Sequence, residues 1–169
     1  MSARGALPFD PIVEARRHWS DHGWEDVADG MAAVTSVTRV AQILLNRVDQ
    51  VLKPFGLTFA RFEVLALLEF SRRGALPLGK VGARLQVHPT SVTSAVDRLE
   101  GQGFVRRTPH PSDGRATLAA LTDGGRTAVR DATAALNREV FADLGLDDGE
   151  LRTLFALLEK MRRAAGDFG

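Results

Sequence analysis

The sequence predicts a mainly helical fold with one small β-hairpin, and three observations support this. Apolar residues recur every three or four positions in long stretches near both ends of the chain. Two short amphipathic segments, residues 78–85 and 89–101, lie in the middle with only three residues between them. Two strand candidates, residues 104–108 and 117–121, enclose a segment rich in turn-forming residues.

Residues 31–53 are predicted to form a long helix that ends at Pro54 and Gly56. Its apolar positions at helical spacing are Val34, Val37, Ala41, Leu44, Val48 and Val51. Three further residues widen this stripe, so the helix is expected to be buried on much of its circumference: Ile43, Leu45 and Leu52. Residues 1–30 are interpreted as a polar extension, with at most a short helix at residues 15–19.

Three more helices are delimited by their capping residues. Thr58 is a good N-cap for a helix to about residue 73, and Thr122 for a helix to about residue 143. Asp147 and Glu150 have the spacing of a capping box at the start of the last helix. The apolar stripe of that last helix is Leu151, Leu154, Phe155, Leu158 and Met161.

This order of elements predicts a winged helix-turn-helix domain at residues 57–121. Its second short helix, residues 89–101, begins with Pro89, which suits the first turn of a helix. Residues 31–56 and 122–169 carry more apolar surface than so small a domain can cover. We therefore expect the N- and C-terminal helices to form a helical dimerisation region; the alternative is that they close the core of a monomer.

The helix at residues 89–101 has the two faces that a DNA-reading helix needs. Val92, Val96 and Leu99 form an apolar stripe for docking. Small polar side chains and one arginine lie off this stripe and are predicted to contact the major groove: Thr90, Ser91, Ser94 and Arg98. Four further residues are predicted to hold the DNA backbone: Lys80, Thr93, Arg106 and Arg107.

The predicted hairpin supplies a second contact with DNA. Arg115 lies at its tip, where an arginine can enter a narrow minor groove, and Asp113 is expected to orient it. The charge distribution agrees, because residues 72–115 hold eight Arg or Lys residues but only three Asp or Glu residues, in a chain whose net charge is +1. A basic segment of this kind favours an anionic partner.

The segment from Val92 to Arg126, VTSAVDRLEGQGFVRRTPHPSDGRATLAALTDGGR, resembles the signature of the MarR family of transcription regulators. The resemblance implies a homodimer on a pseudo-palindromic operator, with repression that a small ligand, often an anionic aromatic, relieves. It also assigns Arg115 to the minor groove and Asp113 to its support. Family members often have an arginine where this chain has Gly114, which removes one backbone contact and loosens the wing tip.

Tryptophans in a polar extension usually pack that extension onto the body of the protein, and the functional alternative is a ligand pocket between the winged domain and the dimerisation helices. One urate-responsive subgroup of the family has a tryptophan in an extra N-terminal helix, an acid on the second helix and an arginine on the recognition helix. Trp19 and Glu63 match the first two, but the third position falls near Ala95, which argues against urate. Arg39 and Phe62 are the other candidates for this pocket.

Several classes of protein are not expected. The chain has no cysteine, which excludes disulfides and thiol chemistry, and it contains no nucleophile motif, so no catalytic residue, metal or cofactor is predicted. It has no apolar run long enough for a membrane span and no signal-peptide core, so a cytoplasmic protein is expected. The alternative to a DNA-binding regulator is a winged-helix protein-interaction module that does not bind DNA.

Overall fold

A computed structural model of the chain describes the backbone of residues 7–110 and 113–169, and their side chains except those of residues 113–115. The chain divides into two compact units, which we call the N-terminal unit (Met1–Gln50) and the winged unit (Val51–Gly169). The predicted fold class, mainly helical with a small β-hairpin wing, is confirmed.

The N-terminal unit consists of α1 (Pro11–Asp21) and most of α2 (Glu25–Leu52). Asp10 caps α1, because its carboxylate accepts the backbone N–H of Ile12 at 2.8 Å. Trp19 and Trp24 pack edge to face across the corner between the two helices, with ring centroids 5.3 Å apart. The short helix expected at residues 15–19 is longer than predicted, because α1 spans Pro11–Asp21. Its Trp19 packs within this unit.

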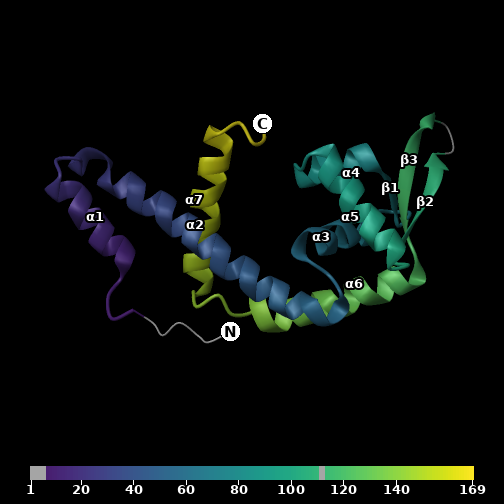
Figure 1. Cartoon of the computed structure of the whole chain (residues 1–169), viewed down its shortest axis with the longest axis horizontal. Helices are drawn as coiled ribbons and strands as arrows, with labels where there is room; N and C mark the ends of the chain where they lie inside the picture. Colours follow the sequence, from purple (N-terminus) through teal and green to yellow (C-terminus); the bar gives the residue numbers. More distant parts are fainter. Residues whose placement is uncertain (1–6, 111–112) are drawn as a thin grey trace. The chain divides into compact units, whose positions relative to one another are not determined.

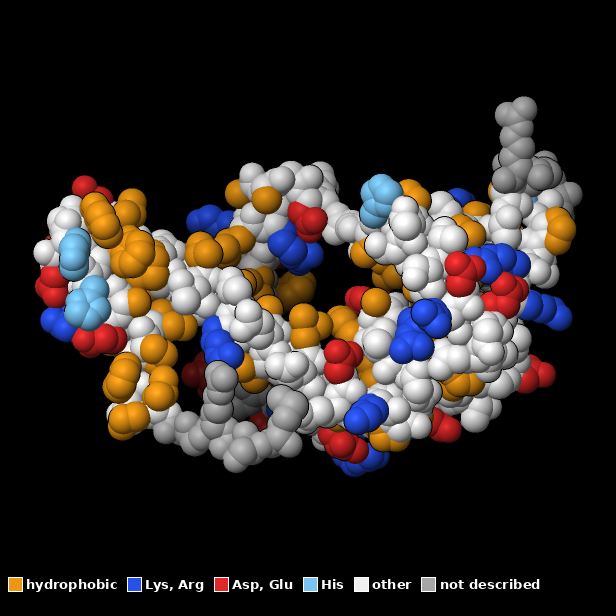
Figure 2. All heavy atoms as spheres, viewed as in Figure 1, with side chains coloured by type: hydrophobic (Ala, Val, Ile, Leu, Met, Phe, Trp, Pro, Cys, Tyr) orange, Lys and Arg blue, Asp and Glu red, His pale blue; other side chains and the backbone are white. Residues whose placement is uncertain are grey.

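The predicted start of α2 was wrong. The helix begins at Glu25 rather than Met31, because Gly30 lies within it instead of interrupting it, and acidic residues fill its first turn. Its apolar side chains are only partly buried within the chain: Val48 and Leu52 are 5% and 0% exposed, but Val34 and Ile43 are 61% and 50% exposed. On the face drawn in Figure 2, hydrophobic side chains gather over this unit.

The winged unit holds the remaining elements. In chain order they are a 3-10 turn (Lys53–Phe55), α3 (Phe59–Glu69), β1 (Ala75–Pro77), α4 (Leu78–Leu85), α5 (Pro89–Gly101), β2 (Val105–His110), β3 (Asp113–Leu121), α6 (Asp123–Leu136), a π-helical turn (Asn137–Phe141) and α7 (Asp148–Ala164). Figure 1 shows the β2–β3 hairpin beside α5, with α6 starting at the foot of the hairpin.

The described strands form one antiparallel sheet in the order β1–β3–β2. Strands β2 and β3 make the predicted hairpin, with Val105 opposite Leu121, and both extend farther toward its tip than expected. The third strand, β1, was not predicted, because three residues ending in proline give no strand pattern of their own. It pairs with β3 through Ala75 opposite Ala120.

A core of aliphatic side chains joins these elements. Leu65 and Leu68 of α3 are fully buried, as are Val96 and Leu99 of α5. The buried face of α5 is thus the predicted stripe, while Val105 and Ala119 bring the sheet onto the same core. Burying each such side chain contributes about 1.5–3 kcal/mol, so this packing fixes α5 on the domain.

The predicted caps of the last two helices are confirmed. The Thr122 hydroxyl accepts the N–H of Gly125 at 3.0 Å at the start of α6. Asp147 and Glu150 form a reciprocal capping box at the start of α7. The regular part of α6 ends at Leu136 and the π-helical turn continues it to Phe141, close to the predicted end at residue 143.

Within the described part of the chain, no helix is both long and apolar enough to cross a membrane.

The junction of hairpin and α6 depends on the absence of a side chain at Gly125. A methyl group there would lie 2.0 Å from the carbonyl oxygen of Phe104. We therefore predict that Gly125→Ala destabilises the protein by about 1–3 kcal/mol or more, measured by urea unfolding. Gly124→Ala is the matched control, because its methyl would meet nothing closer than 3.8 Å. Equal stability of the two variants would contradict this assignment.

Candidate nucleic-acid interface

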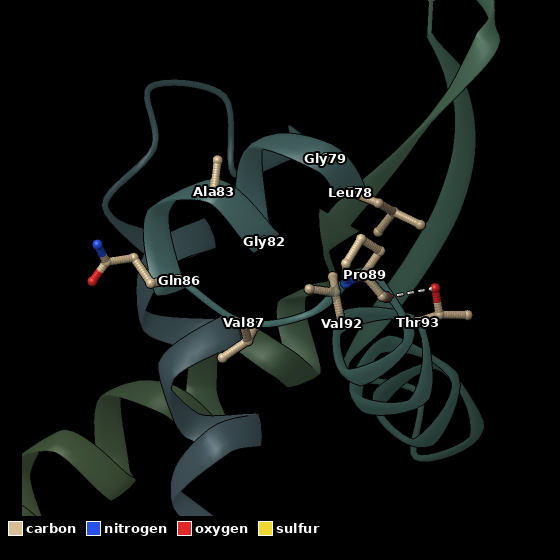
Figure 3. A pocket seen from close by; sticks show the side chains of 9 residues that line it. All are labelled: Leu78, Gly79, Gly82, Ala83, Gln86, Val87, Pro89, Val92 and Thr93. Carbon is tan, nitrogen blue, oxygen red and sulfur yellow. Dashed lines mark hydrogen bonds between the residues drawn. The ribbon is translucent and has the colours of Figure 1, made fainter. Parts of the chain in front are cut away.

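Helices α4 and α5 meet at a sharp corner made by residues 86–88. Gln86 takes a left-handed backbone conformation (φ 53°), which ends α4 and turns the chain. Gly82 lets the two helices approach, because a methyl group there would lie 3.3 Å from Val92 of α5. Figure 3 shows the side chains around this corner, including the hydrogen bond that Thr93 donates to the carbonyl oxygen of Pro89 at 3.1 Å. The corner is the predicted helix-turn-helix.

Beyond its buried stripe, α5 presents an exposed polar face. The predicted major-groove residues Thr90, Ser91, Ser94 and Arg98 are all exposed. Arg98 forms no ion pair with any described carboxylate, so its positive charge is free to interact with a ligand. The structure thus brings three hydroxyls and one guanidinium together on one face of a rigidly packed helix. Such a face can donate hydrogen bonds to base edges and phosphates.

A second exposed face of α5 fastens the helix to the hairpin. Arg107 of β2 donates to Glu100 through Nη1 at 2.6 Å and through its backbone N–H at 2.8 Å, and its Nη2 lies 2.6 Å from Asp97. We call this group of Arg107, Asp97 and Glu100 the wing clasp. Arg107 is also only 26% exposed. Its positive charge is therefore paired with carboxylates of the protein, whereas the sequence analysis predicted a contact with the DNA backbone.

The wing clasp alters the acid–base properties of its members. The backbone N–H and the guanidinium of Arg107 hold the pKa of Glu100 below its ordinary value of 4.5. Burial by itself would lower the pKa of Arg107, but the hydrogen bonds to Glu100 and Asp97 outweigh it and raise that pKa. Sequence reasoning missed both acids, although their three-residue spacing on α5 was a signal that they share a face.

The other predicted DNA contacts lie around α5. Lys80 is exposed on α4, and Arg106 is exposed on β2, next to the clasp. Thr93 is exposed near the start of α5. The side chains of Asp113 and Arg115, at the predicted wing tip, lie outside the described residues.

The residues predicted to form a ligand pocket belong to different units and have different surroundings. Trp19 packs on Trp24 in the N-terminal unit, where Arg39 is exposed on α2. In the winged unit, Phe62 is 7% exposed and stacks on Phe59, so it serves the core. Glu63 is half-buried on α3, and this burial raises the pKa of its carboxyl.

These elements define a winged helix-turn-helix protein whose helix α5 presents a polar, cationic face. The sequence profile of the MarR family matches residues 57–117. The multiple antibiotic resistance protein MarR of Escherichia coli is 31% identical over 116 residues, which are 67% of this chain and 78% of that protein. The chain therefore belongs to the MarR family of transcriptional regulators, which are not enzymes.

Solved structures agree with this assignment. Sco5413, a MarR family regulator of Streptomyces coelicolor, is 52% identical, with a TM-score of 0.76 over 83% of this chain and 97% of that one. Sco3205 from the same species, solved in complex with DNA, is 25% identical, with a TM-score of 0.72 over 81% and 88%. CouR of Rhodococcus jostii, bound to p-coumaroyl-CoA, is 29% identical, with a TM-score of 0.65 over 74% and 87%.

Some curated relatives match over a smaller region. Two mycobacterial HTH-type regulators are 36% identical over 73 residues, so the chain spans about half of their length (51%).

The low pKa of Glu100 makes the contribution of the wing clasp depend on pH. Since the folded-state pKa lies below the unfolded one, the stabilisation is complete above about pH 4.5 and is lost as the pH falls through the folded-state value. We predict that Glu100→Gln is less stable than wild type at pH 7, and that this difference shrinks in acid. Urea unfolding at a series of pH values measures it.

Glu159→Gln is the control for this prediction. Glu159 forms an ion pair with Arg163 at 2.9 Å and has nearly the same exposure as Glu100, 38% against 39%. That pair joins neighbouring turns of one helix, so its loss should change stability at pH 7 by less than about 0.5 kcal/mol. A Glu100→Gln effect no larger than this control would show that the clasp does not stabilise the fold.

Proposed function

We propose that this protein is a sequence-specific regulator that binds double-stranded DNA through α5 in the major groove. The observation that carries the proposal is the exposed face of α5, where Ser91, Ser94 and Arg98 lie together while the opposite stripe is buried. Hydroxyls and a guanidinium on a fixed helix suit hydrogen bonding to base edges. Membership of the MarR family agrees with this function.

The remaining contacts follow from the position of each side chain relative to α5. Lys80, Thr93 and Arg106 are proposed to contact the sugar–phosphate backbone, because Lys80 and Arg106 are exposed on the neighbouring elements α4 and β2 and Thr93 is exposed near the start of α5. Arg115 is proposed to enter the minor groove with support from Asp113, on the basis of the family motif. Arg107 is not included, because the wing clasp uses its charge.

We further propose that the protein acts as a homodimer on a pseudo-palindromic operator. Apolar side chains of α2 and α7 remain exposed in the single chain, among them Val34 and Ile43, and Phe155 and Leu157 at 63% and 56%. Exposed apolar surface of this extent favours association with another copy. Two copies would place their recognition helices in successive major grooves, about 34 Å apart.

Release of DNA by a small ligand is the third part of the proposal, with the protein acting as a repressor. The structure of CouR with p-coumaroyl-CoA gives a relative that binds an aromatic acyl thioester. A ligand would act by preferring dimers whose recognition helices do not fit the operator. Trp19, Arg39 and Glu63 are kept as candidates for its recognition, whereas Phe62 is assigned to the core.

The test is a fluorescence anisotropy titration against duplex DNA from upstream of the protein's own gene and against random duplex of equal length. We predict tighter binding to the upstream DNA, a steep loss of affinity between about 50 and 200 mM salt, and two chains per duplex. Arg98→Ala should cost about 1–3 kcal/mol on the upstream DNA, because it removes a base or phosphate contact.

Arg72→Ala is the control, since Arg72 is an exposed arginine that follows α3 at the end distant from Thr58. It should bind like wild type. Weak binding that is insensitive to salt and equal for both duplexes would overturn the proposal and favour the protein-interaction alternative.

A further inference from the structure

A groove lies between the start of α3 and the first turns of α5. Its volume is about 410 Å³, and its polar lining comprises Thr58, Arg61, Thr90, Ser91, Ser94 and Arg98. None of the described residues that line it is acidic. The groove shares Ser91, Ser94 and Arg98 with the proposed DNA-reading face, so it is a continuation of that face onto α3.

Arg61 is held at this groove by neutral groups. Its Nε donates to the Thr58 hydroxyl at 3.3 Å, and its Nη1 donates to the side-chain oxygen of Gln102 at 3.2 Å. Gln102 is itself fixed by donating to the carbonyl of Gly56 at 2.8 Å. Arg61 forms no ion pair with a described carboxylate, and so its side chain is oriented but its charge is not neutralised.

Arg61 differs in this respect from the arginines at positions 107, 126 and 130 of the winged unit, each of which pairs with a carboxylate. Arg107 lies between two carboxylates, and Arg126 and Arg130 both pair with Glu69. A second hollow, of about 370 Å³ at the corner of α4 and α5, is lined by mostly apolar residues and by none with a charge. The groove at Arg61 is therefore a region in which positive charge and hydrogen-bond donors are both available.

We propose that Arg61 is a DNA-binding residue that holds a phosphate of the duplex beside the major groove that α5 reads. This rests on the proposed function. When a helix lies in the major groove, phosphates flank it on both sides. On one side of α5 lies the hairpin, fastened through Asp97 and Glu100; on the other side lies Arg61. A guanidinium with two donors held by the protein keeps further N–H groups for phosphate oxygens.

A phosphate contact is identified by its effect on salt dependence rather than by affinity alone. Each phosphate that is neutralised contributes about −0.9 to the slope of log affinity against log salt. Arg61→Ala should therefore make the slope shallower by about 0.9 for each chain bound, and should weaken binding to upstream and random duplex alike. Arg61→Lys keeps the charge and should restore the slope, although its affinity need not recover fully.

Gln102→Ala separates this role from a structural one. It removes the partner of Nη1 but leaves the charge of Arg61, so the slope should stay at the wild-type value. If Arg61 were only a brace between α3 and Gln102, then Arg61→Ala and Gln102→Ala would lower thermal stability and affinity together, with the wild-type salt slope. That result overturns the inference.

The outcome is also distinguishable from failure of the proposed function. Arg72→Ala serves as the matched change of charge beyond the far end of α3 and should leave the slope unchanged. Salt-sensitive binding by wild type with an unchanged slope for Arg61→Ala refutes only the role of Arg61. An absence of salt-sensitive binding by wild type refutes the proposed function, and the role of Arg61 with it.

Discussion

The wing clasp is the interaction on which the geometry of the candidate site depends. Arg107 reaches from β2 to two carboxylates one turn apart on α5, and its backbone N–H adds a further hydrogen bond to Glu100. A two-stranded hairpin has little stability by itself and could take many angles relative to a helix. The clasp, together with burial of Val105, fixes one angle, so α5 and the hairpin form a single surface.

Helix α5 serves three purposes because its side chains project in three directions. Val92, Val96 and Leu99 face the core, while Asp97 and Glu100 face the hairpin. The remaining direction, which includes Ser94 and Arg98, borders the groove and is proposed to face DNA. Separation of these directions keeps the acids of the clasp away from the groove. An anionic partner thus meets hydroxyls and arginines there rather than carboxylates.

The features that the sequence predicted well are those set by residues close together in the chain. The limits of α4 and α5, the Thr122 cap and the Asp147–Glu150 capping box each depend on a few neighbouring positions. Apart from the start of α2, where Gly30 does not interrupt the helix, the features that were missed involve residues distant in sequence. Strand β1 exists because β3 pairs with it, and Arg61 meets Gln102 across 41 residues. The ion pairs of Arg107 were also missed, because a charge count does not show which carboxylate an arginine meets.

The central claim is that the exposed face of α5 lies in the major groove of duplex DNA. Because the chain has no cysteine, Ser94→Cys would provide a unique attachment point for an iron chelate that cleaves nearby DNA by hydroxyl radicals. With upstream duplex, this account predicts cleavage confined to a short region in each half-site. The same chelate on Thr153→Cys, exposed on α7, should cut weakly or not at all. Equal cleavage from both positions, or none from position 94 under conditions of tight binding, would contradict the account.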